Sequence, residues 1–319
     1  MSQTAKRERL LIIIAFLCVY IFWGSTFVGM RYGVRYISPA FVSGIRYAIA
    51  GAMMMAIRAA RGQSLRISRR ELVRLSLIGL MLLTGNNVLL AWGEEYITAS
   101  VASLITASIP MMIAVIETTI PGGEPLNWMG WFGTILGVIG LCVLLYPSLR
   151  GQNVLSTHSF LHGSGTALGC AILLVGCVSW AVGSVIARRW TSTADPMLAS
   201  GWQMLIGGAV NVSIGSATGG WQHAHWNLNV ILVLLYLAVF GSLIGYSAYT
   251  YLLHHVPVAK VATYAYINPI VAVGLGAIFL GERLHFLEGI AMVIILVAVA
   301  IVTASKSAVS KDMASAPAE

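Results

Sequence analysis

The sequence predicts an all-α membrane protein in which ten transmembrane helices form two inverted five-helix repeats. Hydrophobic residues make up 58% of the 319 residues and charged residues only 9%, whereas soluble domains typically carry about 25% charged residues. Long apolar runs recur along the chain, and the second half matches the first at a nearly constant spacing. These three observations argue against a soluble domain, an intrinsically disordered chain and a secreted disulfide scaffold.

Each apolar run is long enough to cross a bilayer as a helix, since a hydrocarbon core of about 30 Å requires about 20 helical residues. The runs are continuous and rich in Leu, Ile, Ala and Gly, which favours helices over the alternating strands of a membrane β-barrel. We expect ten spans, at residues 10–30, 39–59, 72–92, 97–119, 126–146, 166–187, 196–217, 228–251, 257–280 and 286–304.

The two ends of the chain need separate interpretations. The first run follows Lys6, Arg7 and Arg9, as the apolar part of a signal peptide would. It lacks a small-residue cleavage site and precedes nine more spans, so we interpret it as a retained helix. Residues 305–319 are rich in Ser, Ala and Lys, and they predict a disordered cytoplasmic tail.

Lys and Arg are distributed unequally between alternate loops. One side holds 14 of them, namely Lys6, Arg7, Arg9, Arg58, Arg61, Arg66, Arg69, Arg70, Arg74, Arg188, Arg189, Lys260, Lys306 and Lys311. The other side holds four, namely Arg31, Arg35, Arg150 and Arg283. Because cytoplasmic loops carry the excess of Lys and Arg, we expect both termini in the cytoplasm. The net charge of +8 is therefore a topology signal and does not indicate a nucleic-acid partner.

The cysteines do not indicate a metal site or a disulfide framework. All four lie within or at the edge of apolar spans, at Cys18, Cys142, Cys170 and Cys177. We interpret them as small hydrophobic residues in packed helices, because their spacing matches no zinc-site pattern. The sequence predicts no bound metal and no cofactor.

The two halves of the chain are related by a duplication. Prolines, tryptophans and arginines in the first half recur after 157 to 159 residues, in the pairs Trp23 and Trp180, Arg31 and Arg188, Pro39 and Pro196, and Pro110 and Pro269. Gly123-Glu124 likewise matches Gly281-Glu282. We place the repeats at residues 1–150 and 160–304. Each repeat holds five spans, an odd number, so the two must cross the membrane in opposite senses.

An inverted repeat indicates a secondary transporter. Such repeats supply two similar conformations, each open to one side, around a small-molecule site near the bilayer midplane. Prolines at that depth leave a backbone carbonyl without its helical donor, and such a group requires a polar cavity or another partner. Pro110 and Pro269 have this depth, and they would free the carbonyls of Thr106 and Ala265.

Amide and aromatic side chains inside spans add candidates for the cavity wall. The amides are Asn86, Asn87 and Asn268, and the aromatic residues are Trp23, Trp180, Tyr246, Tyr264 and Tyr266. Buried amides require partners, so contacts between helices explain them equally well. Aromatic belts at the membrane surface are the alternative for the rings. An aromatic cavity would suit an amphipathic organic solute.

Two ionisable residues are candidates for proton or charge coupling. Arg46 lies within the second span, where ionisable residues commonly mark transport pathways, although its stem is long enough to reach the membrane surface. Glu94 closes the third span at its outer end. It could titrate as a proton-coupling group or attract cationic solutes; the alternative is a carboxyl in a solvated outer loop.

Several segments resemble the EamA family of the drug/metabolite transporter superfamily. They are FWGSTFVGMRYG, SPAFVSGIRYAIAG, GNNVLLAWGEEYITASVASLITASIP and VPVAKVATYAYINPIVAVGLGAIFLGERL. The resemblance covers nearly the whole chain, and it is strongest to bacterial inner-membrane exporters of metabolites and amino acids, with YedA-like members carrying an acidic residue at the position of Glu94. It implies a cavity formed by spans 1, 3, 4, 6, 8 and 9. The chain departs from the family at Pro121-Gly122-Gly123-Glu124, where Leu-Gly-Glu is usual.

Other functions remain as alternatives. A membrane-embedded enzyme would require a nucleophile and base or a metal cluster, and no such motif occurs. A carrier of the same superfamily working as an importer or exchanger is a closer alternative. The sequence fixes neither the solute nor the choice between a monomer and a homodimer.

Overall fold

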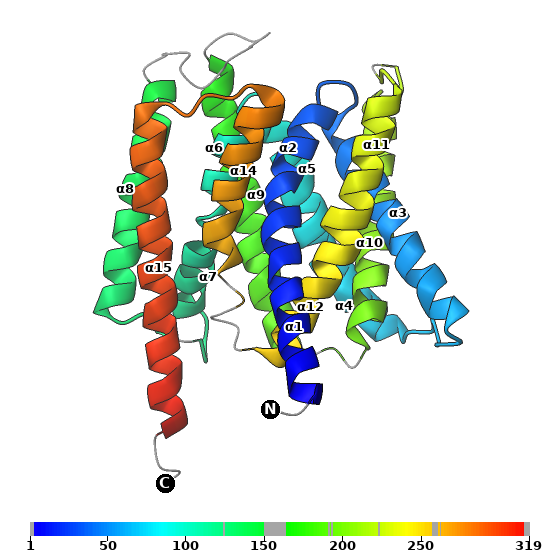
Figure 1. The fold of residues 1–319 in the computed structure, drawn as a ribbon, viewed down its shortest axis with the longest axis horizontal. Coiled ribbons are helices and arrows are strands. Elements are labelled where there is room, and N and C mark those ends of the chain that lie inside the picture. The colour runs from blue at the N-terminus through cyan, green and yellow to red at the C-terminus, as the bar shows by residue number, and fades with distance from the viewer. Residues whose placement is uncertain are drawn as a thin grey trace.

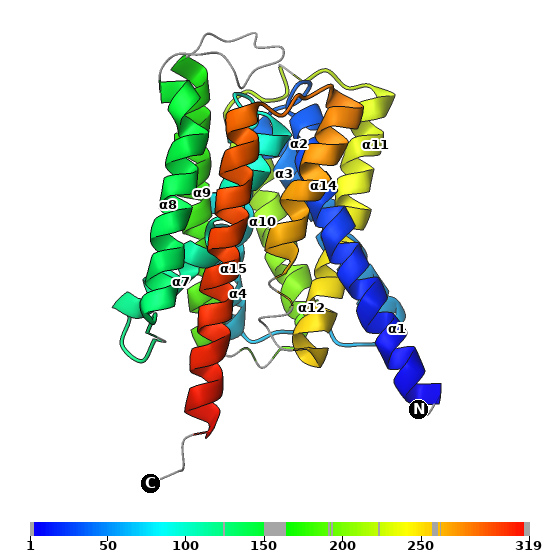
Figure 2. The same ribbon diagram turned by 60° about the vertical axis from the view of Figure 1, so that its left-hand side comes forward.

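The computed structural model describes residues 3–123, 125–149, 164–190, 192, 194–222, 224–256, 261 and 263–315, and within them the chain forms helices and no strands. The helices lie side by side in one bundle (Figures 1 and 2). Nine of the described helices are long and apolar enough to cross a membrane, and Tyr264–Leu280 is a shorter apolar helix. The chain is therefore an all-α, multi-pass membrane protein, as the sequence predicts.

The first five spans are formed by ten elements. They are α1 (Gln3–Cys18), η1 (Val19–Trp23) and α2 (Gly24–Gly33) in span 1, α3 (Pro39–Ala60) in span 2, α4 (Arg69–Gly79), η2 (Leu80–Asn86) and α5 (Asn87–Gly93) in span 3, α6 (Ala99–Thr106) and α7 (Ile109–Thr119) in span 4, and α8 (Trp128–Leu149) in span 5. The η elements are π-helical turns inside longer helices.

The second five spans are formed by seven described elements. They are α9 (Ser164–Arg189) in span 6, α10 (Pro196–Ala217) in span 7, α11 (Leu228–Tyr236), η3 (Leu237–Ile244) and α12 (Gly245–His255) in span 8, α14 (Tyr264–Leu280) in span 9, and α15 (Phe286–Ser315) in span 10. The expected start of span 9, at residues 257–260, lies outside the described residues.

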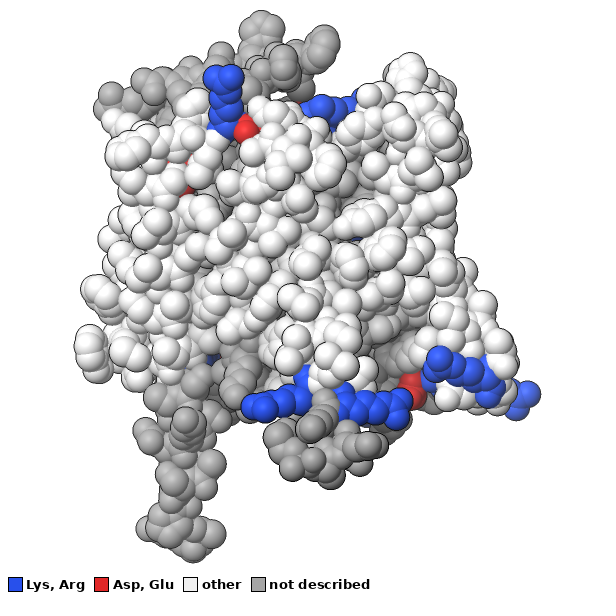
Figure 3. All heavy atoms as spheres, viewed as in Figure 1, with Lys and Arg blue, Asp and Glu red and all other residues white. Residues whose placement is uncertain are grey.

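The start of α1 and the end of α15 lie at the same end of the bundle, here called the terminal end; the other is the distal end (Figure 1). Charged atoms on this face of the molecule gather near the two ends and leave an almost uncharged band between them (Figure 3). The chain rises from the terminal to the distal end through α1 and α2, whereas α9, which opens the second half, runs the opposite way. The two halves are therefore inverted, as predicted.

Matching local signals begin the second span of each repeat. Ser38 and Asp195 are the N-cap residues of α3 and α10, and each accepts hydrogen bonds from the first turn of its helix. Pro39 and Pro196 follow as the first helical residues, where a missing N–H costs nothing. A polar cap followed by proline therefore sets the same helix start in both halves.

Pairs of equivalent helices join the two halves. α3 packs along α10, and α8 packs along α15. A Cβ atom added to Gly44 would lie 2.7 Å from the backbone nitrogen of Val212, and one added to Gly208 would lie 2.5 Å from that of Ala48. Glycine thus lets the backbones of α3 and α10 approach each other closely.

The last helix is longer than the sequence analysis predicts. α15 continues to Ser315, so the beginning of the segment that we expected to be a disordered tail is helical. The residues after 304 are mainly Ser, Ala and Lys, and no Gly or Pro occurs before Pro317. Without a helix breaker, the transmembrane helix continues past the apolar segment.

Candidate functional site: a cavity between the two halves

A cavity of about 110 Å³ lies between the two halves of the bundle. It receives side chains from both repeats, including ten of the eleven residues that the sequence nominates for the cavity wall, and Arg46. These residues are Trp23, Arg46, Asn86, Asn87, Thr106, Pro110, Trp180, Tyr246, Tyr264, Asn268 and Pro269. The structure thus brings most of the predicted site residues together around one space.

The three π-helical turns all contribute to this cavity. Trp23 ends η1 and Asn86 ends η2, while Gly241 and Ser242 lie within η3. A π turn widens a helix locally and leaves backbone groups outside the usual pattern, and such turns are frequent at functional sites. Spans 1, 3 and 8 are therefore irregular where they line the cavity. The sequence pattern does not predict these turns.

The two paired prolines shape the cavity in different ways. Span 4 is broken between Thr106 and Ile109, and Pro110 lies in the first turn of the second piece, α7. Pro269 stays inside α14. The sequence predicts a helix that continues past a freed Thr106 carbonyl, whereas the structure has a complete break just before Pro110. At that position the missing N–H leaves no helical hydrogen bond unmade.

Aromatic rings form one wall of the cavity. The Trp23 ring lies 5.0 Å from that of Tyr249 and 5.1 Å from that of Tyr264, measured between centroids. The indole Nε1 of Trp23 donates a hydrogen bond to the carbonyl of Gly241, 3.1 Å away. This bond fixes the ring of a first-repeat residue against a helix of the second repeat.

The three amides differ in how their hydrogen-bonding groups are satisfied. Asn87 donates to the carbonyl of Leu82 at 3.0 Å. Asn268 is oriented to donate to the carbonyls of Tyr20 and Tyr264, both at 3.2 Å. The Nδ2 of Asn86 has no hydrogen-bond partner among the described residues although the side chain is buried. Asn86 therefore brings an unused donor to the cavity.

Arg46 lies in the cavity wall and does not reach the membrane surface. Only 5% of the residue is exposed. Its Nε donates to Ser242 Oγ at 3.2 Å, its Nη2 to the Tyr47 hydroxyl at 3.1 Å, and its Nη1 to Met30 Sδ at 3.0 Å. These contacts exclude the alternative in which the side chain anchors span 2 at the surface.

Glu94 lies buried beyond the distal wall of the cavity. Its exposure is 0%, and neither carboxylate oxygen has a hydrogen-bond partner among the described residues. Burial raises the pKa of Glu94 well above its usual value; Arg31 opposes the rise, Glu282 adds to it, and Arg46 opposes it. The solvated-loop alternative therefore does not hold for Glu94. Burial also raises the pKa of its half-buried neighbour Glu95 to about 7.

Tyr266 is the one nominated wall residue that does not line the cavity. Its hydroxyl donates to the carbonyl of Val299 on α15, 3.2 Å away. Two residues along a helix correspond to a rotation of about 200°, so the helix that turns Tyr264 toward the cavity turns Tyr266 away. Their spacing of two residues therefore indicates that Tyr264 and Tyr266 lie on different faces of the helix.

The sequence does not predict some of the residues that line the cavity. Tyr47, Ser103, Met204 and Ser242 line the cavity, yet in sequence they look like ordinary residues of packed membrane helices. Ser242 follows Gly241, which together with Gly245 forms a Gly-x-x-x-Gly motif. This motif is the one sequence signal near Ser242, and it indicates close helix packing.

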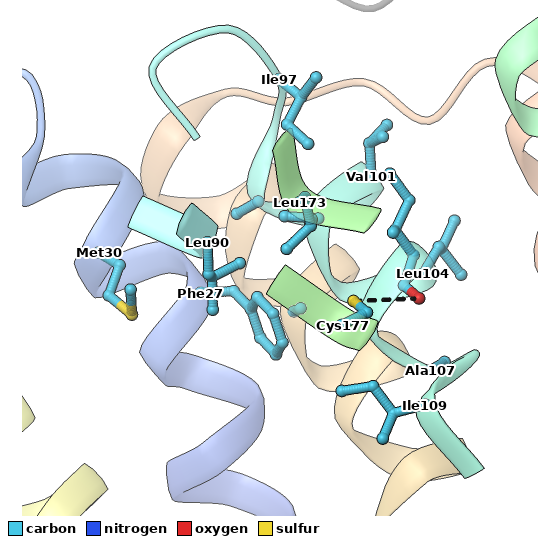
Figure 4. Close-up of a cluster of buried hydrophobic side chains, with 14 of the residues drawn as sticks. Phe27, Met30, Leu90, Ile97, Val101, Leu104, Ala107, Ile109, Leu173 and Cys177 are labelled. Carbon is cyan, nitrogen blue, oxygen red and sulfur yellow. Dashed lines mark hydrogen bonds between the residues drawn. The ribbon is translucent and has the colours of Figure 1, made fainter. Parts of the chain in front are cut away.

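The distal wall of the cavity is closely packed. Phe27 and Leu90 line the cavity and also belong to a hydrophobic cluster that includes Ile97, Val101 and Leu104 (Figure 4). The last three side chains have 0% exposure. The cavity is therefore separated from the distal end by well-packed side chains.

A charged contact joins the two halves at the distal end. α14 ends at Leu280, and its C-cap residue Gly281 has a φ of 67°, the left-handed conformation that glycine favours. Glu282 then reaches the start of α6 and accepts hydrogen bonds from the backbone nitrogens of Ala99 at 2.8 Å and Ser100 at 3.1 Å, and from Ser100 Oγ at 2.7 Å. A carboxylate is favourable at a helix N-terminus, so Glu282 holds span 4 against span 9. We call this contact the distal clasp.

The chain is similar to known transporters along its length. It matches the EamA-like transporter family over residues 10–146 and again over residues 167–304. It is 33% identical over 300 residues to the inner membrane transporter YedA of Escherichia coli, an alignment that covers 94% of this chain and 93% of YedA. These two matches extend over both halves of the bundle.

More distant similarities agree with this result. A probable amino-acid metabolite efflux pump of Escherichia coli is 29% identical over 182 residues, which cover 54% of this chain and 57% of the pump. One protein crystal structure aligns with a TM-score of 0.65 and 17% identity, over 93% of this chain and 98% of that one. The last similarity concerns the fold alone.

Proposed function

Since this chain belongs to the EamA-like transporter family, we propose that it is a secondary active transporter that exports small organic metabolites by alternating access. The observation that carries the proposal is the cavity between two inverted repeats, lined by aromatic rings, amides and Arg46. Such cavities occur in carriers whose halves rock around a fixed site. Its aromatic wall suits the apolar body of an organic solute, and its polar groups suit a polar end.

We place the terminal end in the cytoplasm of a bacterial cell, with the protein in the inner membrane. The Lys and Arg distribution supports this orientation, and the inner-membrane relative YedA supports the location. With this orientation, the packed distal wall and the distal clasp close the cavity toward the outside. Export would require the clasp to open and release the solute there.

Glu94 is proposed as the proton-coupling residue. Its carboxyl is buried and unpartnered in the closed distal region, and three charged residues act on it: Arg31 of α2, Arg46 of α3 and Glu282, which follows α14. Burial favours the neutral form, so Glu94 would hold a proton while this region is closed. Opening would hydrate the carboxyl and allow exchange with the outside.

The proposal predicts that Glu94→Gln separates transport from the proton gradient. In proteoliposomes screened with a panel of radiolabelled organic acids and amino acids, the wild type is expected to concentrate at least one solute when a pH gradient is imposed. The variant should lose gradient-driven accumulation yet still exchange labelled for unlabelled solute, because a neutral side chain of the same shape permits the conformational change but carries no proton.

Glu95→Gln is the matched control, since Glu95 is adjacent in sequence but only half-buried, and it should keep gradient-driven accumulation. Full accumulation by the Glu94 variant would show that Glu94 does not couple protons. If the solute accumulates inside right-side-out vesicles under an inwardly directed proton gradient, the protein would instead be an importer. Absence of transport for the whole panel in the wild type would contradict the proposed function.

A further inference from the structure

Among the described residues that line the cavity, Arg46 is the one Lys, Arg, Asp or Glu. Its three hydrogen-bond partners are a serine hydroxyl, a tyrosine hydroxyl and a methionine sulfur, all of them neutral. A thioether is a weak acceptor. The guanidinium also lies over the Tyr47 ring, 4.5 Å from its centroid. The protein thus solvates this cation with neutral groups only.

No carboxylate of the described residues forms an ion pair with Arg46. Glu94 lies close enough for Arg46 to influence its charge, but it makes no direct contact with the guanidinium. A cation at membrane depth is costly unless it is paired or faces a polar cavity. A guanidinium has five N–H donors, so the three observed bonds leave donors available for a bidentate contact with an anion.

We propose that Arg46 binds the carboxylate of the transported solute, and that the substrates are small monocarboxylates with an apolar or aromatic body. This inference rests on the proposed transport function of the same cavity. The planar guanidinium matches the two oxygens of a carboxylate, and the unpartnered Nδ2 of Asn86 supplies a second donor in the same wall.

The charges of the cavity wall favour a solute that carries a single negative charge. Arg46 contributes one positive charge, and the described lining residues include no carboxylate and no second basic group. A phosphate monoester carries about −1.5 to −2 charges at neutral pH and would enter with excess negative charge. An amine would be repelled by Arg46 and would find no carboxylate. The rings of Trp23, Trp180 and Tyr264 suit the apolar body.

The second repeat carries a neutral residue at the equivalent position. A spacing of 157 residues takes Arg46 to Gln203, whose Oε1 accepts a hydrogen bond from the Tyr246 hydroxyl at 3.3 Å. Gln203 is not among the described residues that line the cavity, so the charge of Arg46 has no equivalent there from the second repeat. Arg46→Gln removes this charge and keeps a side chain that can donate hydrogen bonds.

The test measures binding of matched solutes to the purified full chain at pH 7. Labelled phenylacetate is the probe, and phenylacetamide, phenethylamine, phenylalanine and phenyl phosphate are the competitors. The wild type is expected to bind phenylacetate at least about tenfold more tightly than its neutral isostere, phenylacetamide, since charge-assisted hydrogen bonds are roughly twice as strong as neutral ones. Phenethylamine and phenyl phosphate should compete more weakly than unlabelled phenylacetate.

Arg46→Gln should bring the ratio of the affinities for phenylacetate and phenylacetamide close to one. Arg46→Lys should retain part of the preference for phenylacetate. Arg58→Gln is the control, because Arg58 is also a buried arginine but pairs with Asp195 outside the cavity wall; the ratio should stay at its wild-type value. The inference is overturned if phenylacetate does not bind to the wild type, if phenylacetamide binds equally well, or if the Gln variant keeps the wild-type ratio.

The outcome separates this inference from the proposed function. Carboxylate binding that depends on Arg46 without transport in proteoliposomes would contradict the transporter proposal and leave the binding site standing. Transport of neutral or cationic solutes, unaffected by Arg46→Gln, would leave the transporter proposal standing and overturn the carboxylate site.

Discussion

At the scale of single residues, two buried side chains at or next to the cavity have polar atoms without hydrogen-bond partners among the described residues. Glu94 has two unpartnered carboxylate oxygens, and Asn86 has an unpartnered amide nitrogen. Each such group costs about 1–3 kcal/mol when buried, and single atoms of Arg58 and Asn211, outside the cavity wall, share this cost. The position of Glu94 and Asn86 is consistent with groups reserved for a proton and a solute.

The residues that the repeat pairs were the most predictable. Trp23 and Trp180, and Pro110 and Pro269, line the cavity as the sequence analysis expected. The burial of Arg46 and Glu94 was left open, because the sequence does not show whether a charged side chain near a span end reaches water. That depends on which helices cover it. The prediction that Tyr266 lines the cavity was wrong, because two residues along a helix turn Tyr266 away from the face that carries Tyr264.

The acidic pair at the end of α5 predicts a pH-dependent stability. A carboxyl whose pKa is higher in the folded than in the unfolded chain contributes stability that is complete below its ordinary pKa and is lost as the pH rises through the folded value. For Glu95 this window extends from 4.5 to about 7, and for Glu94 it extends well above 4.5. Thermal unfolding of the purified protein should therefore occur at lower temperature at pH 8 than at pH 5.

When the melting temperature is followed by intrinsic fluorescence, Glu95→Gln should flatten the curve between pH 5 and 7. Glu94→Gln should also reduce the loss of stability with rising pH, because burial raises the pKa of this carboxyl well above 4.5. A wild-type melting temperature that rises steadily from pH 5 to 8, or a variant curve identical to it, would contradict the assigned burial of these two carboxyls.

At the scale of elements, irregular helices line the cavity and regular helices frame it. Spans 1, 3 and 8 carry π turns and span 4 is broken, whereas α3 with α10 and α8 with α15 form close-packed pairs. The apolar runs and their lengths predicted the spans to within a few residues at most ends. The apolar runs do not predict the π turns, because a π turn changes the hydrogen bonding inside a helix without interrupting its apolar sequence.

The distal clasp predicts that Glu282→Ala opens the outside end of the cavity. The substitution removes an acceptor of three hydrogen bonds at the start of α6, and hydrogen bonds to a charged group contribute about 1.5–3 kcal/mol each. The melting temperature should fall, and a cysteine placed at Thr106 should react faster with an impermeant thiol reagent added from outside.

The control for the clasp is Glu288→Ala. Glu288 also accepts a backbone hydrogen bond, from His285 at 2.9 Å, but this contact stays within the start of α15 and does not join the two halves. It should lower the melting temperature without changing the labelling rate. Equal effects of both variants on labelling would show that Glu282 acts as an ordinary helix cap.

At the scale of the whole molecule, duplication and inversion account for both the architecture and the site. The two halves cross the membrane in opposite senses and enclose one cavity, which is the arrangement that allows two conformations of similar energy. The composition and the repeat predicted an all-α bundle of two inverted repeats, but not the helical continuation of α15 to Ser315. The solute was not predictable, because bilayer thickness fixes span lengths and has no counterpart that fixes the contents of a cavity.

The central claim is that the cavity opens alternately to the two sides of the membrane. The most direct measurement places Thr106→Cys in a variant without the four native cysteines and applies an impermeant thiol reagent to right-side-out and to inverted membrane vesicles. Ile295→Cys, fully buried where α15 packs along α8, should stay unlabelled in both. Alternating access predicts labelling of Cys at position 106 from both sides, with transported solute slowing each reaction. Labelling from one side only, under every gradient and solute applied, would contradict alternating access.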